Sequence, residues 1–525
     1  MSKGILLLLV LTMLIFLGAC SGLFSPPQSY AQAAEYEETT GDPQPIERPD
    51  DPVQAFPDDG VLRLAMRHPL TLNPLLNEDA TVAPILRLLF EPLVIFDDTL
   101  RVVGHLAHME MSSDFSRATV AIRHDAIWSD GMPVTSDDLI FSVGVLRQAP
   151  DTVIYKQNVN NIASIERIDS RTVVIVFERP SIMAGHALNF PIIPEHYYRG
   201  HNNPASARNM QPLGNGPYLL EAITPMQSLV FTQSPYTFRH RASIKTVEVL
   251  FIPDEQSRLY AFDQGIIDAI RIPFSEWVKH HSVRQVHHEE FLTMYFEFIG
   301  FNFHREIFTD INIRQGISYT FNVAEAMGIV YSHQGVHSVS PIHPSSWMHD
   351  ETIEANYDIA RAATLLRNLD NEEPLEILVN IEHIERVHIA ERLVMSLDRV
   401  GVMAEVVVLP FEEYHLRLME GDFDLFFGGM QLGFEPDFAF MFQGGELFGV
   451  DPIMEELFAG LHSASTETAY LQAVSALQRG FVERAPIISL GFRHSAVLTG
   501  TRVVQDRPPA SDHVLAFVNE WRIVP

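Results

Sequence analysis

Histidine, whose imidazole ring can bind a metal ion, is plentiful, with 23 in the chain. His280-His281 and His287-His288 form two pairs on either side of Val283 to Val286, which has the pattern of a short strand. Neighbouring side chains of a strand point to opposite faces, so two adjacent histidines rarely bind one ion together, although one from each pair could. Zinc sites built on several cysteines are excluded because the chain has one cysteine. We therefore expect structural or solvated histidines, with no metal and no cofactor.

That cysteine, Cys20, lies where an apolar run meets polar sequence. Lys3 precedes the run Ile5 to Leu17, which is almost entirely Leu, Ile, Val, Met and Phe. This pattern is typical of an export signal, and the run is too short for a permanent membrane-spanning helix. Leu17-Gly18-Ala19-Cys20 resembles the lipobox of bacterial lipoproteins, in which the cysteine sulfur accepts diacylglycerol. The alternatives are a buried thiol at Cys20 and cleavage after Ala31-Gln32-Ala33 without lipid.

The sequence changes character after Cys20. Residues 21–59 carry many prolines and the acidic stretch Glu35-Tyr36-Glu37-Glu38, without apolar periodicity. Such a segment cannot bury enough surface to offset its ordering entropy. We expect residues 1–20 to be a lipoprotein signal peptide and residues 21–59 a disordered tether that lifts a folded body off the membrane.

The usual catalytic motifs are missing from the sequence. It contains no Gly-x-Ser-x-Gly, no Walker A loop and no His-Glu-x-x-His. Gly214-x-Gly216 precedes Pro217-Tyr218 rather than a helix, so it is not a dinucleotide-binding loop. The two carboxylates of a glycosidase need no sequence proximity, so an exported hydrolase of peptides or sugars stays open as an alternative. We expect a protein that is not an enzyme.

Composition limits the remaining function classes. The chain of 525 residues is too long for one core, and two or three domains are expected. Its formal charge is −31, from 36 basic and 67 acidic residues, and such a surface repels phosphate backbones. Nucleic acid is therefore excluded as a partner.

The clearest periodicity lies in the second half. Leu375 to Asn380 has the pattern of a strand, the next apolar residues recur on one helical face from Ile384 to Val400, and Glu405 to Leu409 is again a strand. This is a βαβ unit, which implies a parallel sheet. Phe411 to Met419 is predicted to be a helix that leads to a strand from Asp424 to Phe427.

A second βαβ candidate comprises Val247 to Ile252, a helix from Asp254 to about Gly265, and Asp268 to Ile272. Two α/β sheets predict two lobes, and ligands of such sheets bind outside the carboxyl ends of the strands, here between the lobes. The segment between about 85 and 209 differs. It has short strands and a helix whose start at Thr135 has a capping box with Asp138, so we expect an inserted α+β subdomain.

Several short blocks between about residues 60 and 500 carry a family resemblance. They are Leu72-Asn73-Pro74-Leu75, Ala126 to Asp138, Gly214 to Tyr218, Phe298 to Asn302, Asn312 to Ile317, Pro341 to Trp347, Tyr357-Asp358 and Gly421 to Leu425. In this order and spacing they resemble the large extracytoplasmic solute-binding proteins of ABC importers, the family that binds oligopeptides, dipeptides, nickel chelates and some sugars. The strongest block, around Trp128-Ser129-Asp130-Gly131, resembles the family's "kWsDGtPvTaeD".

The resemblance implies a two-lobed α/β fold of the periplasmic-binding-protein type (type II), with an inserted α+β subdomain. It also implies a monomer that delivers a ligand to ABC permease subunits. The expected division is lobe I in 60–84, 210–295 and 488–525, the subdomain in 85–209, and lobe II in 296–487.

The family's peptide binders commonly hold the ligand's amino group with an aspartate shortly before an acidic-Pro pair in the second lobe. Aligning on Glu435-Pro436 places Leu432 at that position, and a leucine cannot neutralise an ammonium. Either Glu435 or Asp437 replaces the aspartate, or the ligand has no free amine there. A peptide ligand and a non-peptide solute, a sugar or a nickel chelate, both stay open.

Other ligand contacts are expected from position. Gly429, Met430, Gln431 and Leu432 follow a predicted strand at the edge where the ligand should lie, and the glycine permits close backbone approach. Arg67 and His68 end the first strand of lobe I and face the same region from the other side. Trp347 is either an apolar platform for the ligand or a packed core residue. The leading hypothesis is a lipid-anchored receptor; an exported hydrolase and a sensory or adhesive lipoprotein are the alternatives.

Overall fold

The structure is a computed structural model that describes residues 59–273, 276, 286–331, 335–369, 373–436, 438–442, 449–510 and 513–524. Cys20, the predicted signal peptide and the predicted tether up to residue 58 lie outside the described residues. So do His280, His281 and Asp437. No helix within the described ranges is both long and apolar enough to cross a membrane.

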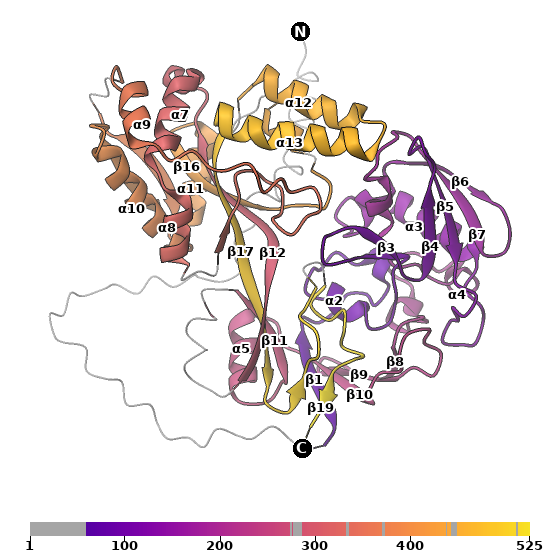
Figure 1. The fold of residues 1–525 in the computed structure, drawn as a ribbon. Coiled ribbons are helices and arrows are strands. Elements are labelled where there is room, and N and C mark those ends of the chain that lie inside the picture. Colours follow the sequence, from indigo (N-terminus) through magenta and orange to yellow (C-terminus); the bar gives the residue numbers. More distant parts are fainter. Residues whose placement is uncertain are drawn as a thin grey trace, which may run out of the picture.

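A seven-stranded sheet runs through the centre of the molecule (Figure 1). Its strand order is β11 (Ala269–Pro273), β17 (Ile487–Gly500), β12 (Val286–Phe301), β16 (Leu425–Gln431), β14 (Leu375–Asn380) and β15 (Ala404–Leu409), and β13 (Gly335–His337) pairs with β17. The long strands β12 and β17 pair with each other, and they extend from the part of the molecule that contains β11 to the part that contains β16. Their register shifts between Leu292 and Phe296.

A second sheet of four strands lies at the β11 end. Its order is β1 (Val61–Met66), β10 (Thr246–Phe251), β9 (Ser228–Gln233) and β8 (Tyr218–Thr224). β1 and β10 are parallel. The prediction of a βαβ unit from Val247 to Ile272 is wrong, because β11, which follows α5 (Glu255–Asp263), pairs antiparallel with β17 in the central sheet rather than with β10.

The βαβ unit predicted in the second half is confirmed. β14 and β15 are parallel, from Leu375↔Ala404 to Asn380↔Leu409, and α10 (Ile384–Asp398) connects them. The other helices of this half are α7 (Ile311–Thr320), α8 (Val323–Val330), α9 (Ile359–Leu365), α11 (Phe411–Glu420), α12 (Pro452–Ser463) and α13 (Glu467–Arg484).

Alternation along β12 divides the core of this half into two clusters, because successive side chains point to opposite faces of the sheet. Ile299 and Phe301 are buried in a cluster that includes residues of α7, α8 and α10. Phe296 and Phe298 are buried in another cluster, with residues of α11, α12 and α13. The central sheet is therefore covered on both faces here.

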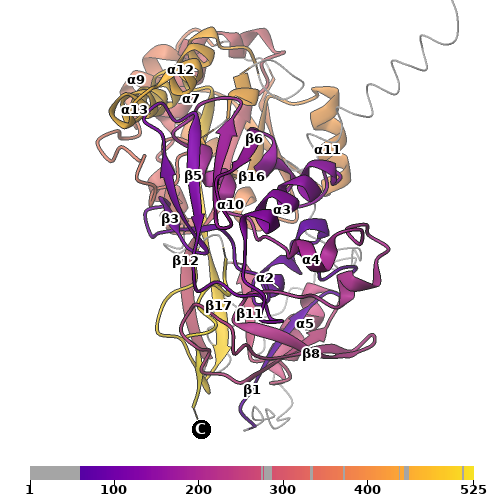
Figure 2. The ribbon, with the colours of Figure 1, turned by 90° about the vertical axis from the view of Figure 1, so that its right-hand side faces the viewer.

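Residues 107–177 form a separate antiparallel sheet, with order β4 (Ala107–Met111), β5 (Arg117–Ile122), β7 (Thr172–Phe177) and β6 (Ile162–Arg167) (Figure 2). α3 (Ser136–Gln148) begins after Thr135, and the predicted capping box with Asp138 is present. Asp138 also accepts a hydrogen bond, at 3.1 Å, from the indole of fully buried Trp128. The remaining short elements are α2 (Ala83–Leu86), β2 (Val94–Phe96), β3 (Val102–Gly104), α4 (Glu195–Tyr198), β18 (Val503–Val504) and β19 (Arg522–Ile523).

Candidate functional site

Arg67 and His68 directly follow the carboxyl end of β1, where β10 also ends. The Arg67 guanidinium lies 3.8 Å from the Asp79 carboxylate, and both side chains are partly exposed. The exposed His68 ring packs edge-on against Phe251, with 4.8 Å between centroids. Leu70 is 94% exposed. This edge of the sheet that contains β1 and β10 therefore offers a cation, an imidazole and an apolar side chain to solvent.

The residues predicted from Gly429 to Leu432 lie at the carboxyl end of β16. β16 extends to Gln431, four residues beyond the predicted end at Phe427, because β12 pairs with it as far as Tyr295↔Gln431. Gly429 and Met430 are buried and Gln431 is exposed. Among the described residues, β14 pairs with β16 only at Leu425 and Phe426, so no strand lies along the second edge of its last residues.

Leu432, the residue aligned with the family's aspartate, lies in apolar surroundings. Leu432 is 7% exposed, belongs to the cluster around Phe296, and its backbone N–H donates to the Met294 carbonyl at 2.9 Å. Glu435 is exposed three residues later. Of the two acids that could replace the aspartate, Glu435 is the one within the described residues.

Trp347 is half-buried between two parts of the chain. The guanidinium of Arg101 lies over its indole ring, and the Tyr470 ring of α13 stacks at 6.2 Å. Its backbone N–H donates to the Thr99 carbonyl at 2.9 Å, and Arg101 also forms an ion pair with Glu467 at 2.6 Å. Trp347 thus contacts the loop that follows β2.

The same loop places an apolar residue in the core of the other half. Leu100 adopts a left-handed backbone conformation, with φ of +61°, and is 6% exposed within the cluster around Phe296. The neighbouring Phe96 ring packs against Phe434 at 4.0 Å between centroids. The loop 97–101 is therefore an apolar and ionic contact between the 85–209 segment and the 296–487 segment.

A buried ionic cluster lies beside Gly429, and the sequence analysis did not identify it. Glu297 of β12 is fully buried and pairs with Arg386 at 2.8 Å and with Arg493 at 3.0 Å. Arg386 also donates to the Asn380 side chain at 3.1 Å and to the Tyr295 hydroxyl at 3.4 Å. A Cβ at Gly429 would lie 2.5 Å from the Arg386 guanidinium, so only glycine leaves room for it.

The cluster creates a positive potential around it. Burial disfavours the charged form of Arg386, but the Glu297 carboxylate outweighs burial and raises the pKa of Arg386. His383, which precedes α10, shows the opposite effect. Burial first, and then the charges of Arg386 and Arg493, lower the pKa of His383 to about 2. His383 is therefore neutral at pH 7.

The sequence carried one indication of this cluster. Glu297 is the one charged residue in the otherwise apolar stretch from Phe291 to Phe301. An acid in the middle of a buried strand requires a basic partner. The partners Arg386 and Arg493 are far away in the sequence, so neither spacing nor periodicity could identify them.

The histidine pairs do not form a metal site within the described residues. His287 and His288 are exposed neighbours on β12, and His288 lies 4.0 Å from Glu290. No group of three or more His, Cys, Asp or Glu side chains in the described ranges could hold a metal ion.

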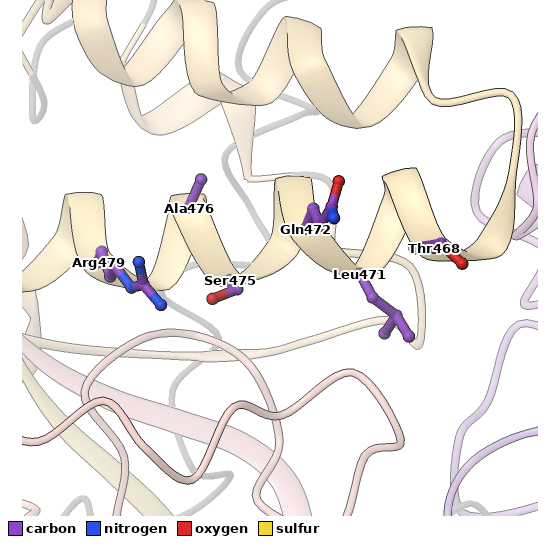
Figure 3. A pocket seen from close by; sticks show the side chains of 6 residues that line it. All are labelled: Thr468, Leu471, Gln472, Ser475, Ala476 and Arg479. Atoms are coloured by element: carbon purple, nitrogen blue, oxygen red, sulfur yellow. The ribbon is translucent and has the colours of Figure 1, made fainter.

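Two hollows lie away from the predicted ligand residues. A groove of about 470 Å³ runs along one face of α13, and all six side chains that line it project from this helix (Figure 3). A small cavity of about 40 Å³ is enclosed near the C-terminal segment, where buried Glu91 pairs with His105 at 2.6 Å and with Arg239 at 3.3 Å. Neither hollow contains any of the predicted ligand residues.

Comparisons with known proteins identify the family. The model of the bacterial extracellular solute-binding proteins, family 5 (middle), matches residues 101–446. An ABC transporter peptide-binding protein of Brucella ovis is 25% identical over 368 residues, which cover 66% of this chain and 69% of that protein. A peptide-binding protein of Agrobacterium fabrum is 25% identical over 356 residues, covering 61% and 56%.

Solved structures show the same fold. A substrate-binding protein of an ABC transporter from Listeria monocytogenes has a TM-score of 0.78 at 17% identity, covering 88% of this chain and 99% of that one. A peptide-binding protein from Clostridium difficile has a TM-score of 0.73 at 19% identity, covering 88% and 100%. A protein from Campylobacter jejuni in complex with Ni(L-His) has a TM-score of 0.68 at 20% identity, covering 88% and 99%.

These comparisons confirm two sequence predictions, the family resemblance and the two-lobed α/β fold. The comparisons test the fold and the class of protein. They do not test the individual ligand contacts, which stay predictions. The chain belongs to the bacterial extracellular solute-binding proteins, family 5.

Proposed function

We propose that this protein is a lipid-anchored receptor that binds an oligopeptide or dipeptide-like ligand between its two lobes and delivers it to an ABC permease. Membership of family 5 makes it an extracytoplasmic solute-binding protein of ABC importers, a family of substrate-binding transport proteins. The anchor, the ligand and its contacts are the parts that we add.

The observation that supports ligand capture best is the pair of strands shared by the two halves. β12 and β17 pair with each other along their length, and they run through both halves of the molecule. Each half also has a pair of parallel strands, β1 with β10 in one and β14 with β16 in the other. Two continuous strands allow rotation of one lobe against the other without breaking the sheet, as hinge closure requires. We propose the lobe boundaries predicted above, with the ligand between Arg67-His68 and the end of β16.

A peptide is the first candidate ligand because the Brucella and Agrobacterium relatives are described as peptide-binding proteins. A nickel chelate is the second, because the Campylobacter neighbour binds Ni(L-His). A sugar is the third. We further propose that Cys20 carries the lipid and that the protein is a monomer.

Titration calorimetry of the exported domain (residues 59–525) with defined dipeptides and oligopeptides, nickel–histidine and oligosaccharides tests the proposal. Saturable binding of one class, with no cleaved product by mass spectrometry, is the expected result. Gln431→Ala should weaken binding, because Gln431 is the exposed last residue of β16. Gln472→Ala is the matched control, since Gln472 lies in the groove of α13. Steady release of a cleaved product would overturn the receptor function.

A further inference from the structure

The small cavity beside the C-terminal segment is lined by more positive than negative groups. Arg87, Glu91, His105, Arg239 and His513 all contribute to its wall. Two guanidinium groups therefore share the cavity with one carboxylate, and no second acid is found among the described residues that line it. In a chain with a formal charge of −31, this local excess of positive charge requires an explanation.

Glu91 is ionised, and its two carboxylate oxygens already have partners. The side chain is 4% exposed, and one oxygen lies 2.6 Å from the His105 ring whereas the other lies 3.3 Å from the Arg239 guanidinium. Burial opposes ionisation of Glu91, but His105 and the two arginines together outweigh burial and lower its pKa to about 2. The one carboxylate of the cavity is therefore used by His105 and Arg239.

Arg87 is the arginine that lacks such a partner. It is the C-cap residue of α2 and is half-buried, and its guanidinium forms no ion pair or hydrogen bond with any described residue. Its charge nevertheless acts at the cavity. It contributes to the lowered pKa of Glu91 and, after burial, is the largest cause that lowers the pKa of His513. The Arg87 guanidinium therefore lies at the cavity with unused N–H donors.

His513 brings the C-terminal segment to the same cavity. It is 6% exposed, and because burial and the nearby arginines lower its pKa well below the usual value, its imidazole is neutral at pH 7. A neutral imidazole still has one N–H to donate, and the ring forms no hydrogen bond with any described residue. Arg239 holds this segment in place, because its guanidinium donates to the Ala516 carbonyl at 3.0 Å.

The cavity has the size of a small ion. Its volume of about 40 Å³ has room for about three water molecules, since each needs about 10–15 Å³. A chloride ion and a water molecule therefore fit, whereas a large anion does not. Apolar side chains, among them Ile95, Phe96 and Leu515, form much of the wall. In such surroundings the attraction between an anion and a guanidinium is stronger than in water.

We infer that this cavity binds a chloride-sized monovalent anion between Arg87 and His513. Arg87 supplies the positive charge, and the imidazole N–H of His513 supplies a second donor. One anion makes the negative charges of the cavity equal in number to its guanidinium groups, and it joins the C-terminal segment to the end of α2. The cavity contains none of the predicted ligand residues, so this inference goes beyond the proposed function and does not depend on it.

Bromide tests the site directly, because it resembles chloride and scatters X-rays anomalously. Crystals of the full-length protein soaked in sodium bromide should show an anomalous peak in the cavity, within hydrogen-bonding distance of Arg87 and His513. A cavity that holds only water, with bromide confined to the protein surface, overturns the inference. This measurement needs no variant, so its outcome does not depend on whether a substitution disturbs folding.

Melting temperatures measure anion binding in solution. The full-length protein in sodium chloride is compared with the same protein in sodium gluconate at equal ionic strength. Both salts screen the charge of the whole chain, but gluconate is too large for the cavity. We expect chloride to raise the melting temperature by about 2–4 °C relative to gluconate, with the saturation of a single site. Equal melting temperatures in the two salts overturn the inference.

Substitutions locate the effect. Arg87→Gln should abolish the chloride-specific rise, and it should fold because Arg87 is half-buried and pairs with no described residue. Glu91→Gln should act in the opposite direction, so that a lower chloride concentration gives half of the rise, because it removes the charge that repels the anion. Arg367→Gln is the matched control, since Arg367 is exposed and does not line the cavity. A chloride-specific rise that persists unchanged in Arg87→Gln overturns the proposed site.

Discussion

The guanidinium of Arg101 lies 4.0 Å from the centroid of the Trp347 indole ring, and the same guanidinium pairs with Glu467 of α13. Arg101 belongs to the loop after β2, whereas both partners belong to the segment proposed as lobe II. Contacts of this kind form only when the two parts approach each other. They therefore stabilise the closed arrangement relative to an open one.

Replacing Arg101 by alanine should favour the open arrangement. The cation–π contact and the exposed ion pair are each worth about 1 kcal/mol or less, so we expect a loss of about 1–2 kcal/mol and ligand affinity lowered up to about tenfold. X-ray scattering should show a larger radius of gyration without ligand. Arg117→Ala is the control, because Arg117 is exposed and lies 3.9 Å from Glu166 within one sheet. Identical scattering and affinity for the Arg101 variant would contradict the role of this contact.

Glu435 can be tested as the replacement for the family's aspartate. If it binds the amino group of a peptide, Glu435→Gln should weaken binding by about 1.5–3 kcal/mol, the range for a charge-assisted hydrogen bond. N-acetylation of the peptide should weaken binding similarly, and the two losses should not add, because both remove the same contact. Calorimetry of the four combinations decides. Full additivity, or no effect of either change, means that the ligand is not held by its amino end at Glu435.

His343 should make the folded state sensitive to acid. Burial, the largest cause, lowers the pKa of His343 from 6.5 to about 4. As the pH falls below about 6.5, the unfolded chain takes up a proton that the folded protein accepts only near pH 4. The free energy of unfolding therefore decreases over this range, by up to about 3 kcal/mol from this group.

Urea unfolding at pH 7, 5.5 and 4.5 measures this effect. His343→Asn should flatten the acid-side slope, and its side-chain carbonyl can still accept from the Ser345 N–H, as the ring nitrogen does at 3.2 Å. His124→Asn is the control because His124 is exposed. An unchanged slope in the His343 variant would count against this assignment.

The proposed anchor depends on one atom, the sulfur of Cys20. Cys20→Ala should give an unprocessed precursor or a soluble species, because no other residue of the chain can form the thioether. A diacylglycerol provides durable membrane attachment, whereas one acyl chain binds only marginally. Mass spectrometry of the mature N-terminus gives the answer. A mature chain that begins at Ala34 without lipid would show that the Ala31-Gln32-Ala33 site is used.

Local patterns predicted the fold where local contacts determine it. The βαβ unit from Leu375 to Leu409 and the capping box at Thr135 followed from periodicity and spacing, and the ordered motifs pointed to the family. The assignment of β11 failed, because its partner β17 lies more than two hundred residues away and hydrophobic patterning does not specify which sheet a strand joins.

The sequence predicted less of the candidate ligand site than of the fold. Strand position placed Arg67, His68 and Gln431 at carboxyl ends, as the structure shows, but burial of Met430 and Leu432 depends on packing against α11–α13. The Glu297–Arg386–Arg493 cluster joins three distant segments. Only the three-dimensional fold brings these charges together.

The place of β17 in the central sheet affects how the chain can fold during export. β17 is the last long strand in the sequence, yet it lies between β11 and β12. Neither neighbour can complete its hydrogen bonds until residues 487–500 have been synthesised and have reached the same compartment. Loop closure over such sequence separations is slow. In an exported chain the central sheet can therefore be completed only on the far side of the membrane, after residues 487–500 have crossed it.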